Sequence, residues 1–452
     1  MSSAPPSPSE LESLARRILS FSKADGCRVG IEASWRGNTR FAAGEITTAG
    51  VSTDTDITIT STLGRRRAST TTNLADDASL RRAVELSERL AKLSPDDPEL
   101  MPELAPQRYG AVEAFGASTA GLDAQPRAEA AGRVLQLPDV KEQSLLAAGF
   151  VDVSARATAV ANSNGLFAHH HATEAEMSTT VRTPDGTGSG WASAGAREWS
   201  DLDPGALGTR AARKALASRN PTAVEPGPYT VILEPQAVAD LIRMLSFYSW
   251  DARQADEGRS PFSKKDGGNR IGETVVDERV TISSDPADPD LRARPFDAEG
   301  LPVGRTVWIE NGVLKNLAYS RFWAQKQGKQ PVVSAGPLGP AQTWNLKMAG
   351  GTKSLDDLVA GTARGILVTH FFYIRVLEPR TVLLTGLTRD GTFLVEDGKI
   401  SRPIKNLRWN ESPLFMLNKV EDLGRAERTS AGVVVPAIKA RDFTFTSISD
   451  AV

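Results

Sequence analysis

The sequence is poor in the residues that build disulfides and metal sites. Cys27 is its single cysteine among 452 residues, so an intramolecular disulfide is excluded and a reducing compartment is favoured. None of the four histidines is followed by glutamate, so the His-Glu pattern of a helical zinc peptidase site is missing. No apolar run approaches the roughly 20 residues of a membrane-spanning helix, and the start MSSAPPSPSE does not resemble a secretory signal. We therefore expect a cytoplasmic protein without a membrane segment.

The chain also lacks an excess of either charge. Its 53 Lys and Arg residues against 55 Asp and Glu residues give a net charge of −2. Proteins that bind nucleic acid through its phosphates usually carry a clear basic surplus or a basic patch. We interpret the short run Arg65-Arg66-Arg67 as solvated surface at a turn, and we expect no direct contact with nucleic acid.

The pattern of the remaining residues predicts an α+β fold. With 40% hydrophobic residues the chain can bury a large core. Ser9 and Glu12 form a capping-box pattern that predicts a first helix, and strand patterns follow at 27–35, 40–47 and 51–62. Four prolines between 95 and 106 predict a linker without regular structure. Both halves of the chain segregate hairpin strands from helices without a steady βαβ rhythm, which favours α+β over a doubly wound α/β fold.

Composition breaks predict two domains, each with mostly antiparallel sheets and packed helices. Residues 1–8 are rich in Ser and Pro and are predicted to be disordered. Residues 9–219 form the predicted N-terminal α+β domain, and residues 220–228, which read NPTAVEPGP, form a linker. Residues 229–452 form a strand-rich C-terminal domain. Its polar, Gly-rich stretch 251–272 is predicted to be a mobile loop, and whether it closes over a site as a lid is left open.

The most informative stretch is 361–413. The apolar runs 366–368 and 371–374 predict strands that are buried on both faces. Asp397-Gly398, and Asn311-Gly312 before this stretch, are two-residue hairpin signals.

Polar residues interrupt these strands, and buried polar groups need partners, so they predict a polar network or a site. We interpret them as a groove for a substrate or a partner. The groove residues are His370, Tyr373, Arg375, Arg389, Asp390 and Asn410. No catalytic residue is predicted, because the sequence has neither a Gly-x-Ser-x-Gly elbow nor a P-loop.

Three consecutive histidines, His169 to His171, are a second candidate. In a strand, His169 and His171 share one face and His170 points to the other, so only two imidazoles could converge on a metal ion. Glu174 and Glu176 could add carboxylates. We interpret the run as a surface strand and expect no metal in this chain.

The segment GILVTHFFYIRVLEPRTVLLTGLTRDGTFLVEDGKISRPIKNLRWNES, residues 365–412, resembles the C-terminal signature of the TldD/PmbA family, whose members were once called modulators of DNA gyrase. Weaker matches, NTRFAAGEI at 38–46 and AVANSNGL at 159–166, fall where that family has its N-terminal motifs. In the TldD branch, a His-Glu-x-x-x-His helix and a later Cys bind zinc for peptide hydrolysis. The PmbA branch, also called TldE, lacks these ligands and pairs with TldD.

The resemblance implies the PmbA branch. The helix that would carry the zinc motif reads LIRMLSFY at 241–248, and Cys27 is far from the position of the thiolate ligand. The implied protein is a zinc-free TldE/PmbA-like subunit of a cytosolic peptidase that degrades unfolded or short peptides, with zinc held by a TldD-like partner. A homodimer is also possible. Two alternatives stay open: a stand-alone, non-enzymatic regulatory or binding protein, and an enzyme with an unrecognised site in the same polar cluster.

Overall fold

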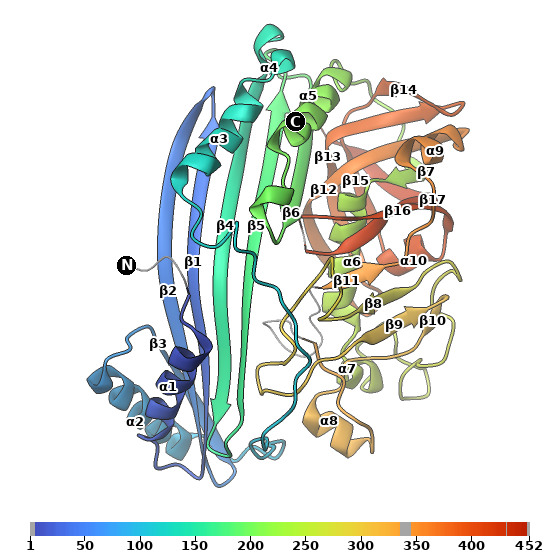
Figure 1. The fold of residues 1–452 in the computed structure, drawn as a ribbon. Coiled ribbons are helices and arrows are strands. Elements are labelled where there is room, and N and C mark those ends of the chain that lie inside the picture. The colour runs from blue at the N-terminus through green and yellow to red at the C-terminus, as the bar shows by residue number, and fades with distance from the viewer. Residues whose placement is uncertain (1–4, 335–344, 431, 450–452) are drawn as a thin grey trace.

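Two β-sheets lie side by side in the computed structural model, which describes residues 5–334, 345–430 and 432–449 (Figure 1). The first sheet has six strands and the second has eleven. The predicted α+β fold with mostly antiparallel sheets is confirmed, although the second sheet also contains the parallel pairs β7–β12 and β11–β17. No helix within the described ranges is long and apolar enough to cross a membrane.

The first sheet is antiparallel throughout and contains the longest strands of the molecule. In spatial order its strands are β3 (Arg66–Thr72), β2 (Glu45–Leu63), β1 (Gly26–Ala42), β4 (Leu146–Asn162), β5 (Phe167–Arg182) and β6 (Ser189–Ala196). The helices that accompany it are α1 (Pro8–Leu19), α2 (Asp77–Leu93), α3 (Ala124–Leu135), α4 (Pro138–Glu142) and α5 (Pro204–Ala217).

The separate strands predicted at 27–35 and 40–47 are wrong. β1 continues from 27–35 through Gly37 and Asn38 to Ala42, because the alternation of buried and exposed side chains is not interrupted there. The predicted strand 40–47 therefore combines the end of β1, the turn and the start of β2. Gly37 and Asn38 look like a turn in the sequence. Gly37 is required for another reason: a Cβ there would collide with the guanidinium of Arg127, which lies over the strand. The actual turn is at Ala43 and Gly44, where both φ angles are positive.

One face of this sheet is apolar and is covered by the helices. Alternate residues of each strand, such as Val29 in β1 and Val151 in β4, pack under α1, α2, α3 and α5. The predicted capping box at Ser9 and Glu12 is wrong, because α1 begins two residues earlier. Ser7 is the N-cap and Glu10 completes the box, which places Pro8 at the first helical turn, where proline is favoured. Within the stretch predicted to be disordered, residues 1–4 lie outside the described residues.

The sheet consists of two similar units. Each unit runs helix, three-stranded meander, helix: α1, β1, β2, β3, α2, and then α3, β4, β5, β6, α5, with α4 inserted after α3. The first strands of the two units, β1 and β4, pair antiparallel at the centre of the sheet. The units are therefore related by an approximate two-fold axis, under which β2 corresponds to β5 and β3 corresponds to β6.

The second sheet begins with β7, two residues before its predicted start, and closes partly on itself because β7 pairs with both β12 and β17. Its strands are β7 (Gly227–Leu233), β8 (Ile282–Ser284), β9 (Thr306–Glu310), β10 (Val313–Leu314), β11 (Leu346–Met348), β12 (Arg364–Glu378), β13 (Leu383–Glu396), β14 (Lys399–Pro403), β15 (Leu407–Glu411), β16 (Val420–Arg428) and β17 (Val434–Ile448). Its helices are α6 (Pro235–Ser249), α7 (Ala252–Asp256), α8 (Arg321–Lys326), α9 (Leu355–Ala360) and α10 (Pro413–Leu417). The apolar side of α6 packs against β12 and β17.

Both hairpin predictions are confirmed. Asp397-Gly398 joins β13 to β14 and Asn311-Gly312 joins β9 to β10, with positive φ at all four residues, as a tight two-residue hairpin requires. The stretch 251–272, predicted to be a mobile loop, begins with helix α7 and then continues without helix or strand, and its Phe262 is fully buried in the core. Its mobility stays a prediction.

The apolar run 366–368 is buried as predicted, but the prediction that 371–374 is also buried on both faces is wrong. Only Phe371 is buried there, whereas Phe372 is 44% and Tyr373 is 60% exposed. The ladder between β12 and β13 is irregular at this point, and Tyr373 has a φ of 54°. This bulge turns the aromatic side chains out of the sheet.

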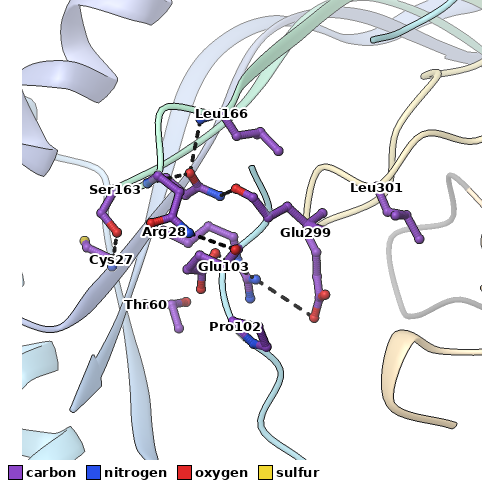
Figure 2. A network of polar contacts seen from close by, with 12 residues as sticks. Cys27, Arg28, Thr60, Pro102, Glu103, Ser163, Leu166, Glu299 and Leu301 are labelled. Carbon is purple, nitrogen blue, oxygen red and sulfur yellow. Dashed lines mark hydrogen bonds and ion pairs between the residues drawn. The ribbon is translucent and has the colours of Figure 1, made fainter. Parts of the chain in front are cut away.

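The proline-rich linker leaves helix α2, contacts the second half of the chain and returns to the first sheet at β5. We call residues 94–116 the strap; it forms no helix or strand, only an isolated bridge at Ala114. Figure 2 shows Glu103 of the strap beside Arg28 of β1, while the Arg28 guanidinium also points toward Glu299 in the second half of the chain. The Arg28 guanidinium lies 3.5 Å from the Glu103 carboxylate and 3.9 Å from Glu299. Arg321 donates a hydrogen bond of 2.7 Å to the carbonyl of Pro102. The strap therefore joins the first sheet to the loop around Glu299 and to helix α8 of the second half of the chain through charged and backbone contacts.

Candidate functional site at the domain junction

The polar face of β5 and β6 meets α6, β12 and β13 of the second sheet, and we call this region the domain junction. The imidazole of His370 stacks on the indole of Trp191, with ring centroids 4.4 Å apart. His370 Nε2 lies 2.9 Å from a carboxylate oxygen of Asp390, and the other oxygen of that carboxylate accepts a hydrogen bond from the hydroxyl of Ser189. Ser189 and Trp191 come from β6, so one network joins the two sheets.

Backbone irregularities on β12 and β13 place this network. The ladder shifts register between Val368 and His370, and Asp390 and Gly391 both have positive φ. Thr369 secures the bend by donating a hydrogen bond of 2.9 Å from its hydroxyl to the carbonyl of Gly391. Because of this local geometry, both the imidazole and the carboxylate face β6.

Asp390 is held in its charged form. Burial alone would raise its pKa, but the hydrogen bond from His370, the charge on that imidazole and the hydrogen bond from Ser189 outweigh burial, so the pKa of Asp390 lies below its ordinary value. A charged carboxylate that accepts two hydrogen bonds is a fixed element of the junction.

Asp240, on α6, has the opposite electrostatic character. Its carboxylate accepts hydrogen bonds from the backbone N–H of Phe371 at 3.3 Å and from the Gln236 side chain at 3.0 Å. Burial raises the pKa of Asp240 to about 6, although His370 and Gln236 act to lower it. The junction therefore contains a carboxyl group that titrates close to neutral pH.

A second acidic group lies on β5. Arg428, on β16, donates a hydrogen bond of 2.6 Å to Glu174, and burial still raises the pKa of Glu174. The pKa of Glu176 is raised to about 7, first by burial and then by the charges of Glu174 and Asp152. The side of the junction formed by β5 is therefore rich in carboxyl groups that hold protons more strongly than usual.

A cleft of about 460 Å³ opens beside the His370 network and is lined by both halves of the chain. Ser189 and Asp390 belong both to the network and to the wall of the cleft. Small polar residues make up much of the remaining wall: Thr187, Ser218, Asn220 and Thr392.

Three of the predicted groove residues lie together. His370 and Asp390 are hydrogen-bonded, and the Arg389 side chain lies 3.9 Å from the Asp390 carboxylate and over the ring of Phe372. The sequence motif therefore correctly brings these three side chains into one polar cluster. Their role as a groove stays a prediction.

The other three predicted residues lie apart from that cluster. Arg375 stacks over the ring of Tyr373 at 4.2 Å, and both side chains are exposed beyond the bulge in β12. Asn410 is on β15, where it pairs with Thr385 of β13, and its side-chain oxygen is buried without a hydrogen-bond partner.

Sequence reasoning missed Ser189, Trp191 and Asp240. The first two lie about 180 to 200 positions before the motif that they contact, and no local pattern connects them to it. Asp240 could have been noticed in the sequence, because it is the only acidic residue in the mainly apolar segment PQAVADLIRMLS.

The triple histidine lies on β5, away from the junction. His169 and His171 share a face as predicted, with ring centroids 5.9 Å apart, and His171 Nε2 lies 2.8 Å from the carbonyl of Pro6. His170 faces the other way, and burial lowers its pKa to about 4. Within the described residues, no three His, Cys, Asp or Glu side chains are arranged to hold a metal ion.

Comparisons with known proteins cover nearly the whole chain. Residues 27–91, 121–219 and 226–447 match the models of domain 1, the central domain and the C-terminal domain of the PmbA/TldA metallopeptidases. A metalloprotease of Methanothermobacter thermautotrophicus is 26% identical over 230 residues, which is 50% of this chain and 49% of that protein. The chain thus aligns with about half the length of this curated relative.

Two solved structures share the fold at 19% sequence identity. A protein of Thermotoga maritima described as a modulator of a DNA gyrase superposes with a TM-score of 0.85, over 96% of this chain and 100% of that one. TldE from Thermococcus kodakarensis superposes with a TM-score of 0.84, over 97% and 100%.

Proposed function

The chain belongs to the PmbA/TldD metallopeptidase family, and we propose that within this family it is a zinc-free, TldE-like subunit that pairs with a zinc-binding relative. The pair would form a cytoplasmic peptidase for unfolded or short peptides. In this proposal the present chain contributes a wall of the peptide-binding chamber and no catalytic group.

The chemistry of α6 carries the proposal. A catalytic zinc site usually needs three protein ligands and a position for water. At the junction, α6 offers one carboxylate, Asp240, and this group is engaged by Gln236 and by the backbone of Phe371. The nearby imidazole of His370 is hydrogen-bonded to Asp390. These residues do not fit a zinc site.

The junction has the chemistry of a peptide-binding surface instead. An extended peptide presents backbone N–H and C=O groups at every residue, and polar side chains with fixed orientations can recognise them. Ser189 and Asp390, both in the cleft wall, are fixed by a hydrogen bond that joins the two sheets. The indole of Trp191 adds a flat apolar surface beside them.

Co-expression tests the proposal. The chain is produced alone and together with a His-Glu-x-x-x-His relative from the same genome, followed by size-exclusion chromatography, zinc analysis and hydrolysis of short unstructured peptides. We expect a stable pair, zinc in the pair but not in the isolated chain, and hydrolysis only by the pair.

Two variants separate the roles of the chains. His370→Ala in this chain should leave the zinc content of the pair unchanged, whereas replacing a zinc-ligand histidine of the relative should remove the metal. Zinc in the isolated chain that is lost in His370→Ala would overturn the proposal. Metal-independent hydrolysis by the isolated chain would favour an active site of its own, and failure to pair or hydrolyse would favour a stand-alone binding role.

A further inference from the structure

The first sheet leaves a long strand edge without a neighbour. β2 pairs with β1 along its whole length, but it pairs with β3 only from Ile57 to Leu63. Between the bulge at Thr47 and the start of that pairing, residues 48–56 have no strand, bridge or backbone hydrogen bond on their outer side within the described part of the chain. Nine residues of regular strand correspond to an edge of about 30 Å.

The corresponding edge in the second unit of the sheet is covered by the chain itself. β5 pairs with β6 only from Ala175 to Arg182. Along the preceding part of β5, the strap approaches as an extended segment: Ala114 forms a parallel bridge with Ala172, and the N–H of Thr173 donates a hydrogen bond of 3.0 Å to the carbonyl of Ala114. At one of two equivalent positions, the fold therefore already accepts an extended polypeptide segment.

The edge of β2 also lacks most of the features that normally prevent strand addition, and its only charged side chains are Asp54 and Asp56. Exposed edges are usually protected by lysine, proline or bulges. Residues 48–56 read TAGVSTDTD, with neither lysine nor proline, and their register against β1 is regular. The outer part of β12, by contrast, has an irregular backbone at Tyr373, where φ is positive, and it carries the cationic side chain of Arg375.

The side chains beside this edge define the strand that would fit. On the face that carries the helices, Val51 is 60% exposed and Ile46 is 42% exposed. On the opposite face, Asp54 and Asp56 are exposed, and no Lys or Arg occurs anywhere in β2. Side chains of a neighbouring strand lie directly beside those of β2, where opposite charges stabilise and like charges destabilise the pair.

We propose that the outer edge of residues 48–56 binds an extended strand of another polypeptide, in which basic residues alternate with apolar ones. The basic side chains lie beside Asp54 and Asp56, and the apolar side chains cover Val51 on the other face. A second copy of this chain fits less well, because its own β2 edge would add two further aspartates and no cation.

A model peptide tests the proposal on the full-length chain. The probe is a capped ten-residue peptide of alternating lysine and valine, and its binding is measured by fluorescence anisotropy and by amide hydrogen exchange. We expect the peptide to slow exchange of the amides of 48–56 and to leave those of the strap unchanged. The Asp54→Lys, Asp56→Lys double variant, which changes only exposed side chains, should bind the peptide about tenfold more weakly at low salt.

Two altered peptides complete the test. Replacing lysine by glutamate should abolish binding to the natural chain and restore it in the double variant. N-methylation of every second backbone nitrogen should abolish binding when the methyl groups face the edge, because strand addition uses those N–H groups. Three results would overturn the proposal. In the first, the amides of 48–56 exchange as fast with millimolar peptide as without it, and in the second, the lysine and glutamate peptides bind equally well. The third is a dimer of this chain in which the amides of 48–56 are protected from exchange without any peptide.

Discussion

Removing the charge of Asp240 should stabilise the protein at alkaline pH. The pKa of this carboxyl is raised from 3.8 to about 6, and this difference corresponds to a cost of at most about 3 kcal/mol for keeping it ionised in the folded state. Asn cannot ionise, so Asp240→Asn removes the cost. It also replaces one acceptor oxygen by an NH₂ group that faces a donor, either Gln236 or the Phe371 N–H, which costs about 1 kcal/mol. We expect a net gain of about 1–2 kcal/mol at pH 8.

The pH dependence gives the sharper test. Below about pH 4, Asp240 is protonated in both the folded and the unfolded chain and has no effect. Between about pH 4 and pH 6, the unfolded chain ionises while the folded chain keeps its proton, so stability falls as the pH rises, and above about pH 6 the full cost is present. Urea unfolding at pH 8 and pH 4 should show the gain in Asp240→Asn at pH 8 only. The exposed Asp266→Asn is the matched control and should change neither value. A variant that is less stable than the natural chain at pH 8 would refute the reasoning.

Three further predictions follow from local geometry. His370→Ala removes a hydrogen bond to a charged carboxylate and a stacked ring, so it should lower the free energy of unfolding by about 2–4 kcal/mol, measured in urea at pH 7. The lowered pKa of Asp390 contributes stability that is lost as the pH falls, so the variant should also lose less stability than the natural chain on acidification. Gly44→Ala should lower the free energy of unfolding by about 1–2 kcal/mol, because alanine is strained at the positive φ but has free space there. In Gly312→Ala the new methyl group also collides with a carbonyl oxygen, so this variant should lose at least about 1 kcal/mol more. Equal urea midpoints of the two variants would contradict this. Burial raises the pKa of Cys27 to about 11, so its thiol should resist iodoacetamide at pH 8 until urea unfolds the chain, and rapid alkylation of the folded protein would be inconsistent with the burial.

Local signals in the sequence predicted local geometry well. Asp397-Gly398 and Asn311-Gly312 specify tight hairpins because two adjacent residues alone must adopt positive φ. The break between strands predicted at Gly37 is wrong, because glycine is needed there for another reason. The side chain of Arg127, 90 positions later, passes over the strand and leaves no room for a Cβ atom. A glycine imposed by such a distant contact cannot be distinguished in the sequence from a glycine in a turn.

The same distinction applies to the candidate site. The sequence groups His370, Arg389 and Asp390 correctly because one hairpin carries all three. Ser189 and Trp191 complete the cluster from β6, and their contribution depends on how the two sheets pack. Tyr373 and Arg375 were grouped with the cluster because they are close in sequence, but the bulge in β12 turns them outward.

The repeated helix, meander and helix arrangement of the first sheet has an evolutionary consequence. Either unit alone would leave its central strand, β1 or β4, without the neighbour that it has in this chain. Duplication of one helix, meander and helix unit, followed by fusion of the two copies, would produce this arrangement. Once both copies lay in one gene, selection could act on them separately, so that one outer flank came to face the second sheet while the other retained its open backbone.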